Sequence, residues 1–193
     1  HNFANPAITA RIVMLLAFAG PMTNWVAPNL APADAITSAT PLVLLGEGKA
    51  VDLLSLFLGN VGGSLGETSA LALLIGAIYL MVRKVISWHT PVAFVGTVFI
   101  LALIRGGPVF GLAEILAGGL FLGAIFMATD YATTPSTNAG RVVFGIGCGL
   151  ITCVIRFFGN YPEGVSFSIL LMNILSPYIS KWTRSKPLGG VKV

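Results

Sequence analysis

The sequence predicts an all-α integral membrane protein, because charged residues are scarce, apolar residues dominate, and the apolar residues gather in long stretches. Charged residues make up 9% and apolar residues 55% of the 193 positions, and the mean hydropathy is +0.89. A typical soluble protein has about 25% charged residues. Eleven basic and seven acidic side chains cannot cover a water-facing surface of this size, which argues against a soluble globular domain and a disordered chain. A net charge of +4 without a basic stripe argues against a nucleic-acid binder.

Six apolar stretches predict six membrane-spanning helices, because a bilayer core is crossed by about 20 mostly apolar residues in helical form. The first stretch contains Arg11 and Pro21, which weaken it, and the second runs from Gly66 to Val82. The third is short and begins at Pro91, where a first-turn proline is tolerated. In chain order the predicted spans are 7–25, 66–82, 91–104, 109–128, 140–158 and 164–180, within a single membrane domain 1–193.

The segment 26–65 is the one long stretch that is not predicted to span. Its apolar run 53–58 is too short to cross and is predicted to lie at the interface or to re-enter. The positive-inside rule assigns the side with more Lys and Arg near the span ends to the cytoplasm. One side collects eight such residues and the other three: Arg11, Arg83, Lys84, Arg141, Lys181, Arg184, Lys186 and Lys192 against Lys49, Arg105 and Arg156. Both chain ends are therefore predicted in the cytoplasm and the segment 26–65 outside.

Small residues are predicted to mark the contacts between helices, because they let helix backbones approach closely in lipid. Two G-x-x-x-G pairs meet this condition: Gly119 with Gly123, and Gly145 with Gly149. A cofactor or ion path along those faces is the alternative to plain packing. The two cysteines, Cys148 and Cys153, match no metal or disulfide spacing and are predicted to be small buried residues.

A short polar sequence in the outward segment is the first candidate for chemistry. It reads Asp34-Ala35-Ile36-Thr37-Ser38-Ala39-Thr40-Pro41. Pro41 favours an extended backbone at Thr40, which would present the threonine hydroxyl to the outside. From the residues alone two interpretations stay open. The segment is a polar turn before an apolar stretch, or it is a site of covalent modification, since an exposed hydroxyl can carry a phosphoester.

The same segment resembles the flavinylation signature Asp-x-x-Ser/Thr-Gly/Ser-Ala-Thr, in which the last threonine carries FMN through a phosphoester bond. Further blocks agree in one order from Asn5-Pro6-Ala7 to about Pro177. They are Gly63-Ser64-Leu65-Gly66-Glu67-Thr68-Ser69, Phe126-Met127-Ala128-Thr129-Asp130, Tyr161-Pro162-Glu163-Gly164-Val165-x-Phe167 and Leu171-Met172-Asn173. Over nearly its whole length the chain is similar to the D subunits of the Rnf ion-translocating oxidoreductase. Their sibling is the B subunit of the sodium-pumping NADH:quinone oxidoreductase.

This resemblance implies a flavin-carrying membrane subunit of a ferredoxin:NAD oxidoreductase that moves Na+ or H+. FMN would be esterified to Thr40, with Asp34, Ser38 and Ala39 completing the motif, and a non-covalent riboflavin is also implied, without a residue to hold it. The implied location is the bacterial inner membrane, with Thr40 on the outer side. The implied partners are a second flavinylated subunit and iron–sulfur membrane subunits. The chain shows no dinucleotide-binding fingerprint and no cysteine cluster, so we do not expect it to bind NAD or ferredoxin itself.

The resemblance also implies a fold of about ten spans, arranged as two inverted repeats in a transporter-like architecture. The chain begins His1-Asn2-Phe3 rather than with Met, so we expect its six spans to be the later part, with four spans before His1. In one place the sequence departs from the family pattern. Ser180 stands after Pro177-Tyr178-Ile179, where relatives often carry an acidic residue, which puts any ion role of that position in doubt.

Four residues form a candidate ion path. Asp130 follows the fourth span, where a carboxylate opposes the helix dipole, and we expect it either to cap the next helix or to help capture a cation. Thr134 and Asn138 continue the same polar loop, together with Thr133 and Ser136. Glu114 lies inside the fourth span, where an acid is usually paired or functional, and a paired or snorkelled carboxylate is slightly favoured over an ion relay.

Four further polar residues have mainly structural interpretations. Ser64 and Glu67 have the spacing of a capping box at the start of the second span, although a helix start near a flavin can also bind anionic groups. Asn173 is predicted to form an interhelical hydrogen bond within the sixth span. His89, beside basic residues and Trp88, is predicted to anchor the chain at the cytoplasmic interface.

Two classes of function remain. The first is a redox subunit that holds a flavin and passes electrons within a membrane complex, coupled to ion flow. The second is a channel or secondary transporter without a redox cofactor, which glycine-rich helices and a few intramembrane polar groups would suit equally well. Composition does not separate the two, and the resemblance favours the first.

Overall fold

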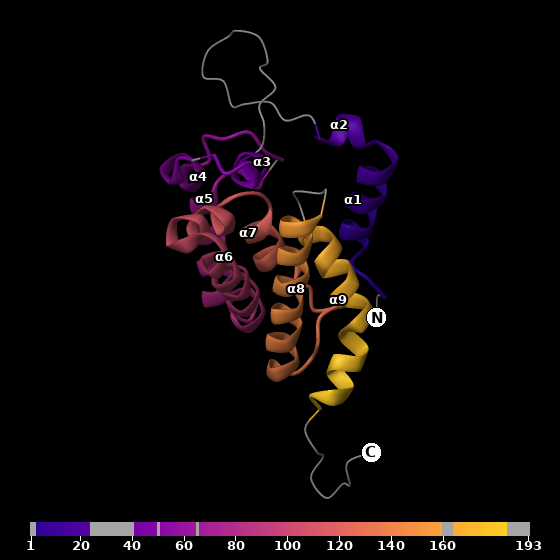
Figure 1. The fold of residues 1–193 in the computed structure, drawn as a ribbon. Helices are drawn as coiled ribbons and strands as arrows, with labels where there is room; N and C mark the ends of the chain where they lie inside the picture. Colours follow the sequence, from indigo (N-terminus) through magenta and orange to yellow (C-terminus); the bar gives the residue numbers. More distant parts are fainter. Residues whose placement is uncertain (1–2, 24–40, 50, 65, 160–163, 185–193) are drawn as a thin grey trace, which may run out of the picture.

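A computed structural model describes residues 3–23, 41–49, 51–64, 66–159 and 164–184, and these residues form helices and connecting turns without a strand (Figure 1). The predicted flavinylation motif, Asp34 to Thr40, lies outside them. The elements are α1 (Pro6–Ala17), α2 (Ala19–Thr23), α3 (Pro41–Gly46), α4 (Leu53–Leu58), α5 (Ala70–Val82), α6 (His89–Leu116), α7 (Leu120–Leu122), the π-helix η1 (Gly123–Met127), α8 (Asn138–Phe158) and α9 (Val165–Trp182).

Side-chain caps set several helix starts. Asn5 accepts hydrogen bonds from the first amides of α1, Asp52 caps α4, and Thr137 caps α8. The Ser55 hydroxyl and the amides of Leu54 and Ser55 hold the pKa of the Asp52 carboxyl below its usual range. The prediction of a helix start at Ser64 was wrong, because the cap of α5 is Ser69, which accepts from the Ala72 amide.

Glycines interrupt the middle of the chain at two places. Gly107 has φ 82° and ψ −178° inside α6, a conformation that only glycine adopts without strain, and it separates the predicted third and fourth spans. The fourth span is itself broken, because Gly118 turns with φ 66° between α6 and α7. The first predicted span is also divided, since Phe18 leaves helical geometry between α1 and α2.

The major segments alternate in direction. Gly145 approaches Thr90 and Ala93 while Gly149 approaches Phe94 and Thr97, so α8 runs parallel to the first half of α6. In contrast, α9 is antiparallel to α8, since Thr152 bonds Ser168 and Thr137 bonds Thr183 (Figure 1). Two ends of the bundle result. We call them the Arg141 end, where α8 begins, and the Arg156 end, where α8 finishes near α3.

On α5 small side chains are buried while several large apolar side chains are exposed, which is the reverse of the pattern in a water-soluble helix. Its small residues Ala70 and Ala77 are buried, whereas Ile75, Ile78 and Val82 are 60%, 63% and 73% exposed. Contiguous exposed apolar surface of this kind suits contact with lipid or with another membrane helix. Of the described helices, α6 and α8 are long and apolar enough to cross a bilayer, while α1 and α5 are shorter apolar helices. An all-helical membrane fold is consistent with these features, and the count of six spans stays a prediction.

Candidate functional site

A buried ion pair joins two helices at the Arg156 end. The Arg156 side chain donates from Nη1 to Glu114 Oε2 at 2.9 Å, and the two side chains are 2% and 6% exposed. The same nitrogen donates to the Glu114 carbonyl at 2.7 Å, and Nη2 donates to the Ala117 carbonyl at 3.3 Å. These carbonyls belong to the last turn of α6, where no further helical amide follows. Arg156 therefore neutralises Glu114 and also terminates the broken helix.

This arrangement confirms that Glu114 is a paired carboxylate. The partner is Arg156 on α8, however, and not Arg105, which lies nearer in sequence. The Arg105 guanidinium carbon instead lies 4.3 Å from the centroid of the Phe157 ring. Because a cation over an aromatic face leaves its N–H groups at the rim, the Arg105 guanidinium keeps hydrogen-bonding capacity for a further group.

The two arginines line a cavity of about 430 Å³ beside α3. Its walls combine basic, aromatic, apolar and backbone surfaces from α3, α6 and α8: Leu42, Leu45, Gly46, Gly48, Arg105, Gly106, Phe110, Glu114, Arg156, Phe157 and Gly159. Phe110 and Phe157 lie tilted with centroids 6.5 Å apart. The α3 residues in this wall follow the motif residue Thr40 closely in sequence, because α3 begins at Pro41.

The loop after η1 folds around Asp130 at the opposite, Arg141 end. The Asp130 carboxylate accepts hydrogen bonds from the backbone amide of Ala132 at 3.2 Å and from the Thr133 hydroxyl at 3.1 Å. It also accepts one from the side-chain amide of Asn5 at 3.5 Å. The Thr134 hydroxyl donates to the Asp130 carbonyl instead. Of the loop residues predicted to line a site with Asp130, Thr133 donates its hydroxyl to this carboxylate, whereas no described side-chain bond joins Thr134 or Asn138 to it.

The capping role that we considered for Asp130 is not observed, and Asp130 does not bond to the nearby Arg141 either. Thr137 caps α8, and the Arg141 Nε donates to the Pro135 carbonyl at 3.3 Å. No ion pair of Asp130 with a described residue is found. Asp130 organises its own loop and links it to the start of α1 through Asn5.

Another acid, Glu67, is almost fully buried near the start of α5. Its Oε1 accepts from the Ser64 amide at 2.8 Å, and its Oε2 lies 3.6 Å from an Arg11 nitrogen. The hydrogen bond between Glu67 and the Ser64 amide that the predicted capping box requires is therefore formed, although Ser64 is not the helix cap. The Arg11 contact explains how a basic residue is accommodated within the first apolar stretch.

The small residues behave as packing positions. A Cβ at Gly145 would lie 2.8 Å from the Thr90 carbonyl oxygen, and one at Gly149 would lie 2.6 Å from Thr97 Cβ. Gly123 approaches Val165 of α9 in the same way. Cys148 and Cys153 are both free and buried, as predicted.

Two polar predictions have a different outcome. Asn173 is buried, and neither its amide oxygen nor its nitrogen has a partner among the described residues, so the expected interhelical hydrogen bond is not made there. His89 stacks on Trp88 with ring centroids 4.2 Å apart, in keeping with an anchoring pair at a helix start.

Sequence reasoning placed Arg156 only in a charge count and gave Phe157 no role. A signal was present, since an arginine at the end of an apolar stretch needs a partner in a membrane. Arg156 and Glu114 are 42 residues apart in the sequence, so no local pattern predicted that they pair.

Comparison with known proteins shows the family to which the chain belongs. The family described as NQR2, RnfD, RnfE matches residues 1–189. Relatives include the D subunit of the Na(+)-translocating ferredoxin:NAD(+) oxidoreductase complex of Acetobacterium woodii, 45% identical over 100% of this chain and 61% of the relative. The D subunit of the proton-translocating ferredoxin:NAD(+) oxidoreductase complex of Clostridium ljungdahlii is 41% identical, over 98% and 62%.

A third relative, the D subunit of the ion-translocating oxidoreductase complex of Stutzerimonas stutzeri, is 38% identical over 98% of this chain and 64% of its own length. The chain thus spans slightly under two thirds of the length of these relatives. With a family match over 189 of 193 residues, the chain belongs to the NQR2, RnfD, RnfE family.

Proposed function

We propose that this chain is the flavin-carrying part of a membrane subunit in an ion-translocating ferredoxin:NAD oxidoreductase. Family membership and the names of three relatives support the complex. The sequence Asp34-x-x-Thr37-Ser38-Ala39-Thr40 supports covalent FMN on Thr40. That motif is the single observation that carries the flavin proposal.

The described residues near the motif fit such a group. The cavity beside α3 offers the Phe110 and Phe157 rings and apolar α3 side chains against a planar ring system. Arg105 offers N–H donors that are not used by a described acid. A bound flavin supplies one- and two-electron transfer, and a positive charge beside its ring or phosphate tunes its potential. In this proposal Arg105 supplies that charge, while Arg156 keeps Glu114 neutralised and the cavity wall in place.

The proposed topology has six spans, with both chain ends in the cytoplasm and Thr40 outside. Two observations support it: the eight-to-three asymmetry of basic residues, and the alternating directions of the helices. A broken fourth span agrees with a transporter-like fold, in which discontinuous helices surround the translocated ion. A cysteine at Ala33 is predicted to react with a membrane-impermeant thiol reagent in whole cells. Labelling that requires lysis would mean the opposite orientation.

A channel or secondary transporter without a redox cofactor is the second candidate, because the broken helix would serve it equally well. The two candidates differ in one simple measurement. After denaturation in acid, the redox subunit keeps flavin fluorescence on its gel band, and the transporter does not. A wild-type band without fluorescence, from cells that contain the flavin transferase, would reject the flavin proposal.

A further inference from the structure

Two adjacent cavities on one side of the bundle differ sharply in chemistry. The first, of about 390 Å³, lies at the Arg141 end and contains two basic residues, Lys84 and Arg141. Hydroxyl and aromatic residues form much of the remaining wall, together with three apolar residues: Ser87, Trp88, Thr90, Thr129, Tyr131 and Thr134, with Met81, Val85 and Ile86. None of the described residues that line it is acidic. An anion is therefore the complementary ligand.

Lys84 is held in this cavity by an unusual backbone. The amides of Lys84 and Val85 bond the carbonyls of Met81 and Leu80, which closes α5 in a Schellman motif. Lys84 adopts φ 56°. In other proteins this position of the motif is usually glycine, which adopts positive φ without strain. The end of α5 therefore places a cation at this cavity, at a position where glycine is favoured.

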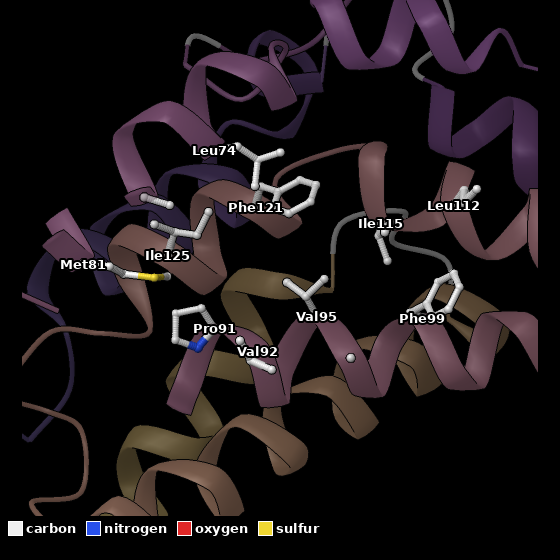
Figure 2. Close-up of a pocket in the computed structure, with 12 residues that line it drawn as sticks. Leu74, Met81, Pro91, Val92, Val95, Phe99, Leu112, Ile115, Phe121 and Ile125 are labelled. Atoms are coloured by element: carbon white, nitrogen blue, oxygen red, sulfur yellow. The ribbon is translucent and has the colours of Figure 1, made fainter. Parts of the chain in front are cut away.

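The second cavity is an apolar groove of about 490 Å³ between α5, the two halves of α6, α7 and η1 (Figure 2). Pro91, Val92, Val95 and Phe99 follow one another along α6, with Leu74, Phe121 and Ile125 opposite them (Figure 2). Met81 borders both cavities, and Thr90 of the first is followed directly by Pro91 of the second. The two cavities therefore meet at Met81 and at the first turn of α6.

We propose that the two cavities together bind one anionic phospholipid. Its phosphate lies between Lys84 and Arg141, and an acyl chain follows α6 from Pro91 towards Phe99. A ligand that is anionic at one end and purely apolar along the other matches the order of the two cavities. The groove volume is within the range of about 300–1,000 Å³ for small-molecule sites. Basic pockets between helices on the cytoplasmic side are typical sites for anionic headgroups, and the Arg141 end is the basic-rich end. This inference does not depend on a flavin at Thr40.

The test is a titration of the purified, delipidated complex with phosphatidylglycerol and phosphatidylcholine, with bound lipid counted by native mass spectrometry. The variant Lys84→Gly with Arg141→Gln removes both cations, and glycine suits the left-handed backbone at position 84. The same mass spectra show whether the variant complex is assembled, and only assembled complex is compared. We expect its preference for phosphatidylglycerol to fall about 25-fold, because each basic side chain near an anionic headgroup contributes about fivefold. The matched control is Lys181→Gln with Arg184→Gln, at the same end but outside the cavity, and it keeps the preference.

A second variant tests the acyl chain. Gly96 borders the groove, and a Cβ built there meets no atom within 4 Å, so Gly96→Leu introduces an apolar side chain into the groove from an open position. We expect this variant to bind fewer phosphatidylglycerol molecules although both cations remain. Unchanged binding in Gly96→Leu would mean that only a free phosphate group is recognised. Wild-type complex that binds no phosphatidylglycerol in preference to the control lipid would mean that another protein segment covers the groove. Either result overturns the proposal.

Discussion

Removal of the Arg156 side chain should destabilise the broken fourth span more than any other single substitution at the Arg156 end. Arg156→Met deletes the 2.9 Å ion pair with Glu114 and the donors to two α6 carbonyls. Breaking a buried ion pair by removing one partner costs about 3–5 kcal/mol, because the other charge stays buried without compensation. The carbonyls of Glu114 and Ala117 lose their donors in the same step, and an unsatisfied buried acceptor costs about 1–3 kcal/mol.

The assay is thermal unfolding of the purified full-length subunit in detergent, followed by tryptophan fluorescence. A loss of about 3 kcal/mol or more should lower the midpoint by about 6 °C or more. Glu114→Gln should also destabilise the protein, because Arg156 then stays buried without a balancing charge. Its effect should be smaller than that of Arg156→Met, because the hydrogen bonds from Arg156 to the carbonyls of Glu114 and Ala117 remain. Arg105→Met is the matched control. It removes an arginine from the same cavity, and among the described residues this arginine has a cation–π contact with Phe157, worth about 0.5–1 kcal/mol, and no ion pair. Equal midpoints for Arg156→Met and Arg105→Met would refute the reasoning.

Two further predictions follow from the packing of α6 on α8 and from the Asp130 loop. Gly149→Leu should prevent close contact of α8 with Thr97 and Phe94, at a cost of about 1–3 kcal/mol or more. In contrast, a Cβ at Gly96 meets no atom within 4 Å, so Gly96→Ala should not lower the unfolding midpoint. A similar midpoint for the two variants would contradict this packing. Asp130→Asn should assemble normally, because Thr137 and not Asp130 caps α8, and if the carboxylate recruits the transported cation, turnover should need more Na+. Unaltered Na+ dependence in a correctly assembled Asp130→Asn complex would end the ion role.

Element positions were predicted best where an apolar stretch matched one continuous helix. The stretches 140–158 and 164–180 correspond closely to α8 and α9. The predicted gap between 104 and 109 contains Gly107, where the chain turns. The break within 109–128 was not predicted, although Gly118-Gly119 marks it, because glycines in membrane helices more often serve packing.

The site could be predicted only in part, because its contacts join distant residues. The pairing of Glu114 with Arg156, the position of Arg105 over Phe157 and the link from Asn5 to Asp130 all depend on how helices pack. Local patterns were informative where the partner is close in sequence, as for Glu67 and the Ser64 amide. Even there, the pattern did not show that the helix cap is Ser69.

The measurement that tests the central claim most directly is the intact mass of the wild-type subunit and of Thr40→Ala, both expressed with the flavin transferase present. The account predicts a wild-type mass increased by one FMN in phosphoester linkage, and an unmodified mass for Thr40→Ala in protein that is folded and inserted in the membrane. The conservative variant Thr40→Ser keeps a hydroxyl and serves as the control for the chemistry of the linkage. An unmodified wild type, or a flavin that remains on Thr40→Ala, would contradict the account.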